Sequence, residues 1–349
     1  MTSSPLNVRI LDGGTGHELK RRLAGTFTDA ALANSSFPDA VQCLHAEYIS
    51  AGADVVTTNT FAVTPWHLNR VLDAHDAEAS VEGLAAAAGQ LARQAVDSEA
   101  TRRGVRVAGC LPPLRDCYAS EDWLVGDGAA ANEARDTYST LVAALAPSCD
   151  LFVVETASYA SQACMAARAA AQGCAPGTEL WVSWTLADSL HAGPRLRGGQ
   201  ALADACQDVI LSGVQVDGWL VNCCSPHIAA SDATWSKLHE AASNSGARLV
   251  GCSPNAFKTT TSQWLDGGGA ADAATSWAPD PDFDSTDSPP SWRPHCFGTW
   301  GAALIEQEMK RCHHARSVAL GGCCGTTPAH IAALSAALSH HTFNAISQQ

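Results

Sequence analysis

Two pairs of adjacent cysteines are the residues of this sequence most suited to chemistry. Cys323 and Cys324 lie in the stretch SVALGGCCGTTPAHI, and Cys223 and Cys224 lie in LVNCCSP. Adjacent thiols can bind one metal ion only if the backbone between them turns sharply, and nearby glycines allow such a turn. Three glycines surround the later pair: Gly321, Gly322 and Gly325. The later pair therefore predicts two ligands of a metal site whose third ligand comes from elsewhere in the chain.

Eight short apolar runs alternate with stretches of helical length, and this alternation indicates the fold. The runs are residues 8–11, 54–61, 106–110, 151–156, 180–185, 218–223, 248–253 and 317–322. Helical stretches between them include residues 77–100, 132–146 and 298–315. The runs are almost continuously apolar, as expected of strands buried on both faces. The pattern predicts one domain over residues 1–349, a (β/α)8 TIM-type barrel.

Polar residues interrupt the apolar runs near their carboxyl ends, where a barrel of this type places its chemistry. They are Asp12, Asn59, Glu155, Asn222, Cys223, Asn255, Cys323 and Cys324. Thiols from the sixth and eighth strands can therefore meet at one mouth. Three cysteine sulfurs with one open position are typical of a catalytic zinc site, and thiolates favour zinc over magnesium or calcium. On spacing alone, either Cys223 or Cys224 fits as the third ligand.

Other uses of the cysteines are also open at this point. Adjacent cysteines can form a redox switch, or a closed structural zinc site in a binding protein. A zinc hydrolase is less compatible, because such enzymes generally use histidine and carboxylate ligands. Most of the 14 cysteines stand singly in apolar helical stretches. We interpret those as small buried apolar residues.

Charge and hydropathy exclude several classes of function. The net charge of −14 argues against nucleic acid as a partner, because phosphate binding requires clustered lysine and arginine. An acidic surface instead favours a cationic small molecule. No apolar run approaches the roughly 18 residues of a membrane span, and the start MTSSPLNVRILDGG lacks the apolar core of a signal peptide. We expect a cytoplasmic protein with no membrane partner; the sequence does not indicate an oligomeric state.

An insertion breaks the alternation between the seventh and eighth strands. Residues 262–296 are rich in Asp, Pro, Gly and Ser, which predicts an inserted loop. If this loop folds over the barrel mouth, its tryptophans Trp264, Trp277 and Trp292 form a cage for a cation; the alternative is that they pack on the surface.

Taken together, these motifs resemble the homocysteine S-methyltransferase family. The resemblance runs through ILDGGTGHEL, ISAGADVVTTNTF, AGCLPPL, VVETAS, VNCCSP, CSPNAF and GGCCGTTPAHI, so it covers nearly the whole chain. The combination of Asn-Cys after the sixth strand with Gly-Gly-Cys-Cys-Gly after the eighth is highly specific. The insertion at 262–296 is the chief departure from the family pattern.

The resemblance implies a role for each motif residue. One Zn²⁺ per chain would be bound by Cys223, Cys323 and Cys324, while Cys224 stands at a position that varies in the family. Asp12 and Glu155 would hold the amino group of homocysteine. The residues implied to border this bound amino acid are Gly13, Gly14 and Asn222. From the residues alone, Asp12 could instead cap the following helix, and Glu155 could form a buried ion pair.

The implied reaction needs no catalytic side chain beyond the activated substrate. A free thiol has a pKa near 8.5, so only a few per cent of it is thiolate at neutral pH. Bound to zinc, homocysteine can lose its thiol proton and still attack a methyl group, forming methionine. Family donors are onium compounds: S-methylmethionine, S-adenosylmethionine or betaine. DGGTGHELKRRL and GGCCGTTPAHI are more similar to the single-domain, sulfonium-using branch than to the betaine branch. S-methylmethionine is therefore the expected donor, and S-adenosylmethionine is the second choice.

Overall fold

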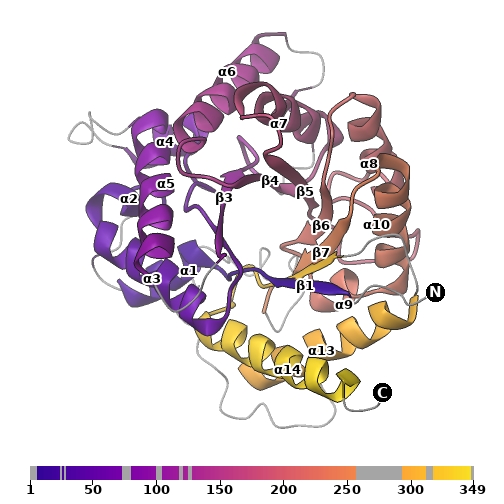
Figure 1. Ribbon diagram of the computed structural model, residues 1–349. Helices are drawn as coiled ribbons and strands as arrows, with labels where there is room; N and C mark the ends of the chain where they lie inside the picture. The colour runs from indigo at the N-terminus through magenta and orange to yellow at the C-terminus, as the bar shows by residue number, and fades with distance from the viewer. Residues whose placement is uncertain are drawn as a thin grey trace.

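The chain forms a ring of eight parallel strands, which confirms the predicted (β/α)8 barrel (Figure 1). The computed structural model describes residues 6–23, 26, 29–72, 80–99, 104–117, 121–124, 128–256, 293–311 and 317–346. The strands are β1 Asn7–Ile10, β2 Val55–Thr57, β3 Arg106–Leu111, β4 Leu151–Ala157, β5 Glu179–Trp184, β6 Gly218–Asn222, β7 Leu249–Ser253 and β8 Ser317–Leu320. Each of the eight predicted runs overlaps one of them.

The ring closes at two seams that involve β1. On one side β1 pairs along its length with β8, from Asn7 opposite Ser317 to Ile10 opposite Leu320. On the other side Leu11 forms a parallel bridge with Val55 of β2. The Asp12 N–H donates to the carbonyl of Val55 at 3.1 Å. Closure brings the carboxyl ends of the first and last strands together.

Helices surround the ring on its outer side (Figure 1). They are α1 Thr15–Arg22, α2 Ala33–Ser36, α3 Pro38–Ala51, α4 Pro65–Val71, α5 Val81–Ser98, α6 Gly128–Leu145, α7 Ala160–Gly173, α8 Leu202–Leu211, α9 Pro226–Ala229, α10 Asp232–Ser245, α13 Pro294–Arg311 and α14 Pro328–Ile346. Local sequence sets their ends. The Ser231 hydroxyl, for example, accepts from the Thr234 N–H at the start of α10, and Gly246 ends that helix in the left-handed conformation.

Two buried layers hold the barrel together. Apolar side chains from alternate strand positions fill the interior of the ring, among them Val153, Trp181 and Leu220. Their neighbours in sequence point outward and pack against the helices; Trp184 and Trp219 stack there with ring centroids 6.5 Å apart. Because both faces of each strand are covered, the strands read as continuous apolar runs.

The predicted insertion at 262–296 falls mostly outside the described residues, and so do Trp264, Trp277 and Trp292. Its last residues differ from the prediction, because Pro294–Cys296 form the first turn of α13. Proline is well tolerated in a first helical turn, where its missing N–H has no partner to lose. Among the helices that the structure describes, none combines the length and apolar character that crossing a bilayer would require.

Candidate functional site

Three thiols meet at the carboxyl ends of β6 and β8. The sulfurs of Cys223, Cys323 and Cys324 all lie within 4.8 Å of one another. The Cys223 and Cys324 sulfurs are 3.9 Å apart, and those of Cys323 and Cys324 are 4.0 Å apart. Ligands at about 2.3 Å from a tetrahedral zinc stand about 3.8 Å from one another. The three sulfurs therefore match the spacing that one shared ion requires, and we call them the cysteine triad.

The backbone at Cys223 decides which cysteine of the Asn-Cys-Cys motif joins the triad. Cys223 has a φ of 52°, a left-handed conformation that is unusual for a residue other than glycine. Such strain is typical of functional positions held by their surroundings. Its N–H donates to the carbonyl of Ser253 at 3.1 Å. The turn sends Cys224 away from the triad and into the apolar core, where it is fully buried.

The end of β7 ties the two halves of the triad together. The Asn255 N–H donates to the carbonyl of Cys224 at 3.0 Å. Its side-chain oxygen accepts from the Cys324 N–H at 3.2 Å. The Cys323 N–H donates to the carbonyl of Pro254 at 2.9 Å. Pro254 and Asn255, which follow β7, thus connect the ends of β6 and β8, two strands that are far apart in sequence.

The glycines around Cys323 and Cys324 act in two different ways. Gly325 has a φ of 83°, so it provides the left-handed turn expected from the sequence. Gly321 and Gly322 are instead needed for close packing, because a Cβ on Gly321 would meet Leu11 and one on Gly322 would meet Thr326. The expected conformational freedom therefore applies to Gly325, while lack of space explains the other two.

Gly13 and Gly14 pack directly on the turn that carries the triad. A Cβ on Gly14 would lie 2.6 Å from the Cys323 carbonyl oxygen, and one on Gly13 would lie 2.7 Å from the Thr326 hydroxyl. The Gly14 N–H donates to this hydroxyl at 3.1 Å, and the hydroxyl donates to the Cys323 carbonyl at 2.6 Å. Tyr48 donates to the carbonyl of Thr326 at 3.2 Å. The loop after β1 is thus shaped to fit against the cysteines.

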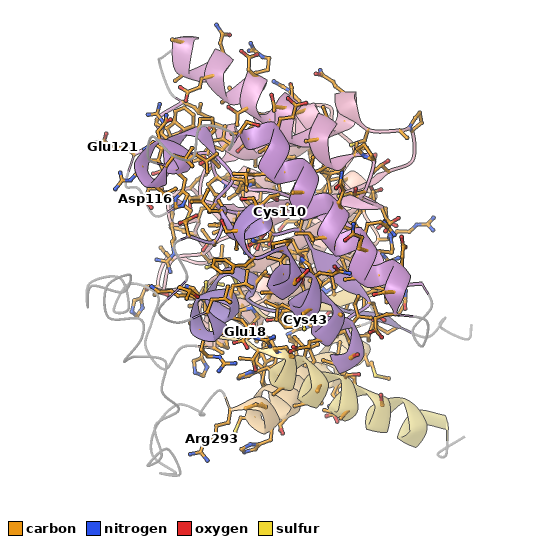
Figure 2. All side chains as sticks on the ribbon, turned by 90° about the vertical axis from the view of Figure 1, so that its left-hand side faces the viewer. Glu18, Cys43, Cys110, Asp116, Glu121 and Arg293 are labelled. Carbon is orange, nitrogen blue, oxygen red and sulfur yellow. The ribbon has the colours of Figure 1, made fainter. Side chains whose placement is uncertain are left out.

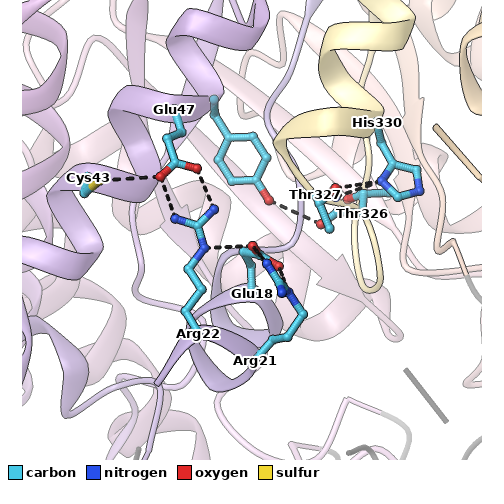
Figure 3. Close-up of polar contacts among 9 residues, drawn as sticks. Glu18, Arg21, Arg22, Cys43, Glu47, Thr326, Thr327 and His330 are labelled. Atoms are coloured by element: carbon cyan, nitrogen blue, oxygen red, sulfur yellow. Dashed lines mark hydrogen bonds and ion pairs between the residues drawn. The ribbon is translucent and has the colours of Figure 1, made fainter. Parts of the chain in front are cut away.

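Ion pairs anchor the helix that follows this loop (Figure 3). Glu18 of α1 is buried and accepts from Arg21 at 2.6 Å and from Arg22 at 2.7 Å. Although burial opposes ionisation, these two arginines hold the pKa of Glu18 below its usual value. Arg22 also pairs with Glu47 of α3 at 2.7 Å. The network fixes α1, and with it the loop that contacts the triad.

Two acidic side chains stand beside the triad within the barrel. Asp12 accepts from the Thr57 N–H at 2.7 Å and from its hydroxyl at 3.1 Å. Burial raises the pKa of Asp12 to about 7; the Thr57 hydrogen bonds lower it, and the charge of Glu155 raises it. Burial also raises the pKa of Glu155 to about 7, where the hydrogen bond from Cys110 lowers it and Cys223 raises it. A cation would relieve both shifts.

The alternatives considered for these two acids do not apply in the structure. Helix α1 follows Gly14 and begins with no side-chain cap, so Asp12 does not cap it. Within the described residues, Glu155 forms no ion pair with lysine, arginine or histidine. Among the residues that the structure describes, neither carboxyl group forms an ion pair with lysine, arginine or histidine.

Asn222 connects β4 to β6 beside Glu155. Its side-chain oxygen accepts from the Thr156 N–H at 3.0 Å and from the Ser183 hydroxyl at 2.7 Å. Its amide nitrogen donates to the Thr156 hydroxyl at 2.7 Å, and Glu155 Oε1 lies 3.5 Å away. Thr156 is left-handed, with a φ of 57°, where the β4–β5 register shifts. The Asn222 side chain thus bonds with Thr156 and Ser183 and lies next to Glu155. Contact of Asn222 with a substrate stays a prediction.

The sequence does not predict the roles of most residues that support the site. The sequence marks Asn255 only as a polar strand end. Asn59, another strand-end residue, donates to the carbonyl of Ala30 before α2 and to the side chain of Asn34 within α2. Cys110 ends an apolar run and donates to Glu155, so the same strand-end rule finds it when applied to every run. Thr326 carries no signal beyond its place after the glycine-bracketed cysteines.

Comparison with known proteins gives a consistent result. The family model for homocysteine S-methyltransferase matches residues 9–338. The structure is similar to that of homocysteine methyltransferase MmuM from Escherichia coli. Its metallated form is 23% identical, with a TM-score of 0.64 over 95% of this chain and 96% of that one. Its oxidized form is 23% identical, with a TM-score of 0.65 over 94% and 95% of the two chains.

A methyltransferase from Methanosarcina mazei shares the fold more distantly, at 12% identity and a TM-score of 0.51 over 97% of this chain and 95% of that one. No curated protein matches the sequence significantly. The family model covers almost the whole chain, including the strand ends that carry the triad and both acids. The protein therefore belongs to the homocysteine S-methyltransferase family.

Proposed function

We propose that the protein transfers a methyl group from a sulfonium donor to the thiol of L-homocysteine, forming methionine. S-methylmethionine is the proposed donor, ahead of S-adenosylmethionine. The observation that carries the proposal is the cysteine triad, with sulfur separations of 3.9 and 4.0 Å, next to Asp12 and Glu155, two acids with no ion pair in the described part of the chain. Family membership supports homocysteine as the acceptor.

The triad fits one Zn²⁺, with Cys223, Cys323 and Cys324 as its protein ligands. Three thiolates are a donor set that selects zinc over the harder cations, and they leave a fourth position for the substrate. When bound, zinc would lower the pKa of the homocysteine thiol and keep a lone pair available on its sulfur. The metallated form of MmuM, a protein of similar fold, supports a metal in this family.

Asp12 and Glu155 would bind the other end of homocysteine. Its ammonium group would place a cation beside both carboxyl groups, and the raised pKa values of about 7 would fall on binding. Gly13 and Gly14 keep the loop after β1 close to the cysteines, so the amino group and the sulfur of one ligand can be held together. Fixing both ends of the acceptor orients its sulfur for attack.

The methyl transfer balances without an added acid or base. The homocysteine sulfur forms a bond to the methyl carbon, while the bond from that carbon to the donor sulfur breaks and its electron pair stays on the donor. The sulfonium becomes a neutral thioether, and the thiol proton passes to solvent. The donor loses its positive charge in this step. The net charge of −14 favours a cationic donor.

A panel of methyl donors tests this proposal directly. The protein, loaded with zinc, is incubated with homocysteine and S-methylmethionine, S-adenosylmethionine or betaine, and methionine is measured. We expect fastest formation with S-methylmethionine. Activity with betaine alone would overturn the sulfonium assignment. One zinc per chain with no methionine from any donor would overturn methyl transfer and favour a structural zinc site or a redox switch.

Replacing Glu155 by glutamine separates substrate binding from metal binding. We expect Glu155→Gln to weaken homocysteine binding by roughly 30-fold or more, because truncating a charge pair costs about 2 kcal/mol or more. Zinc content should stay at one per chain. Calorimetric titration and metal analysis measure the two quantities, with the exposed Glu240→Gln on α10 as a control. Loss of zinc from Glu155→Gln would contradict the division between metal ligands and amino-group ligands.

The raised pKa values predict a pH dependence for ligand binding. Methionine, the expected product, has no thiol, so its binding reports on Asp12 and Glu155. Both acids titrate near 7 in the free protein and would be ionised beside the bound ammonium. Binding therefore releases protons, and affinity should rise by about tenfold per carboxyl group between pH 6 and pH 8. In Glu155→Gln the rise should be smaller. An affinity that is flat over this range would contradict the prediction.

A further inference from the structure

Cys110 is a buried thiol that contacts Glu155 and has no role in the proposed chemistry. It lies near the end of β3, is 0% exposed, and occupies the interior of the barrel (Figure 2). Its thiol donates to Glu155 Oε2, with 2.9 Å between sulfur and oxygen. This contact is the shortest hydrogen bond that Glu155 makes within the described residues, since the Asn222 amide nitrogen is 3.5 Å from Oε1.

Two threonine hydroxyls hold the backbone of Cys110. The Cys110 N–H donates to the Thr58 hydroxyl at 3.0 Å, and the Thr60 hydroxyl donates to the Cys110 carbonyl at 2.8 Å. The two threonine hydroxyls are themselves 3.0 Å apart. All three residues are buried. The residues after β2 therefore fix the backbone at the end of β3, from which the thiol reaches Glu155.

The charges around Glu155 explain why a donor is needed there. Glu155 interacts electrostatically with Asp12 and with Cys223, and both of these groups carry negative charge when ionised. A thiol is a weak hydrogen-bond donor. It orients one carboxylate oxygen while leaving most of the acceptor strength of the group for an incoming ammonium. A stronger donor, or a cation, would compete with the ligand.

We propose that Cys110 is a positioning residue for the amino group of homocysteine, acting by holding the Glu155 carboxylate in the orientation that receives the ammonium. The inference rests on the proposed function, since it assumes that Glu155 binds this amino group. It predicts that the identity of residue 110 affects binding of the acceptor and leaves the methyl-transfer step at saturation unchanged. It also predicts that residue 110 acts only through Glu155.

A double-mutant cycle tests this inference on the zinc-loaded protein. Cys110→Ala, Cys110→Ser, Glu155→Gln and the double variant Cys110→Ala/Glu155→Gln are compared by calorimetric Kd for homocysteine and by KM and kcat. Cys206→Ala, which removes a buried thiol from α8, controls for loss of a cysteine from the core. Thermal unfolding and zinc content check that each variant folds.

We expect Cys110→Ala to raise the Kd and KM for homocysteine by about tenfold with kcat within about twofold, as befits loss of one hydrogen bond to a charged group. Cys110→Ser, which keeps a donor, should remain within about threefold of the parent protein. In the Glu155→Gln background, the alanine substitution should change Kd by less than about twofold.

Three outcomes would overturn the inference. They are an unchanged Kd in Cys110→Ala, an equal loss in the serine and alanine variants, and the same tenfold loss in the Glu155→Gln background. If the parent protein itself forms no methionine with any donor, the proposed function fails instead. Where the parent is active and Cys110→Ala binds homocysteine as well as the parent, only the inference about Cys110 fails.

Discussion

Replacing Cys323 by serine is expected to abolish zinc binding and methyl transfer together. The variant keeps two of the three triad sulfurs and puts a hydroxyl, which is a poor ligand for zinc, in place of the third. Loss of a residue that merely supports a metal site typically costs 10- to 100-fold. Loss of a direct ligand should therefore reduce activity by more than about a hundredfold. Zinc per chain and the rate of methionine formation are the two measurements.

Cys224→Ser is the matched control for this variant. Cys224 is adjacent to a triad member and equally a cysteine, but its side chain lies in the apolar core. We expect this variant to keep one zinc per chain and to lose some stability only. Fresh, reduced protein is required, because oxidised thiols release the metal. If Cys323→Ser retained both zinc and activity, the triad would not be the metal site.

Replacing Gly14 by alanine is expected to damage the metal site without changing any ligand. The added methyl group would lie 2.6 Å from the Cys323 carbonyl oxygen and 3.4 Å from the Cys324 Cα. The first distance is well inside van der Waals contact, so the turn carrying two triad sulfurs must shift. Overpacking of this kind costs about 1–3 kcal/mol. Thermal unfolding should show the loss of stability, and metal analysis should show less than one zinc per chain.

Gly128→Ala is the control for the glycine substitution. Gly128 is the first residue of α6, and a Cβ added there meets no atom within 4 Å. Alanine has a higher helix propensity than glycine, so this variant should be as stable as the parent or more stable. A Gly14→Ala protein with the parent's unfolding temperature and full zinc content would show that the loop after β1 tolerates displacement.

The fold was predictable because a parallel barrel imposes a simple pattern on sequence. Strands covered on both faces must be apolar throughout, and all eight such runs contain strands. Their lengths were less predictable. The run at 54–61 gives only three residues of strand, Val55–Thr57, because Thr58 and Thr60 turn to bond with each other and with β3. Side-chain hydrogen bonds of this kind compete with the sheet and leave no periodic signal.

The cysteine triad was predictable from the rule that strand ends converge, but its membership was not. Spacing alone could not choose between Cys223 and Cys224; resemblance to a family chose Cys223. The structure gives the reason, a left-handed residue at Cys223 that separates the directions of two adjacent side chains. The contacts of Asn255 and of Gly14 with the triad depend on how strands and loops meet in three dimensions. No local pattern contains that information.

Strand β8 completes the ring, and two of the three triad thiols follow it directly. Assembly of the triad therefore depends on closure of the ring. Cys223 and Cys324 are 101 positions apart in sequence, and their sulfurs lie 3.9 Å apart in the closed ring. All three sulfurs come together only where β8 lies in its place between β1 and β7. A metal bound by all three sulfurs would join β6 to β8 across β7 and oppose reopening of the ring. Removal of such a metal should therefore weaken the pairing of β8 with its neighbours before it affects the rest of the barrel.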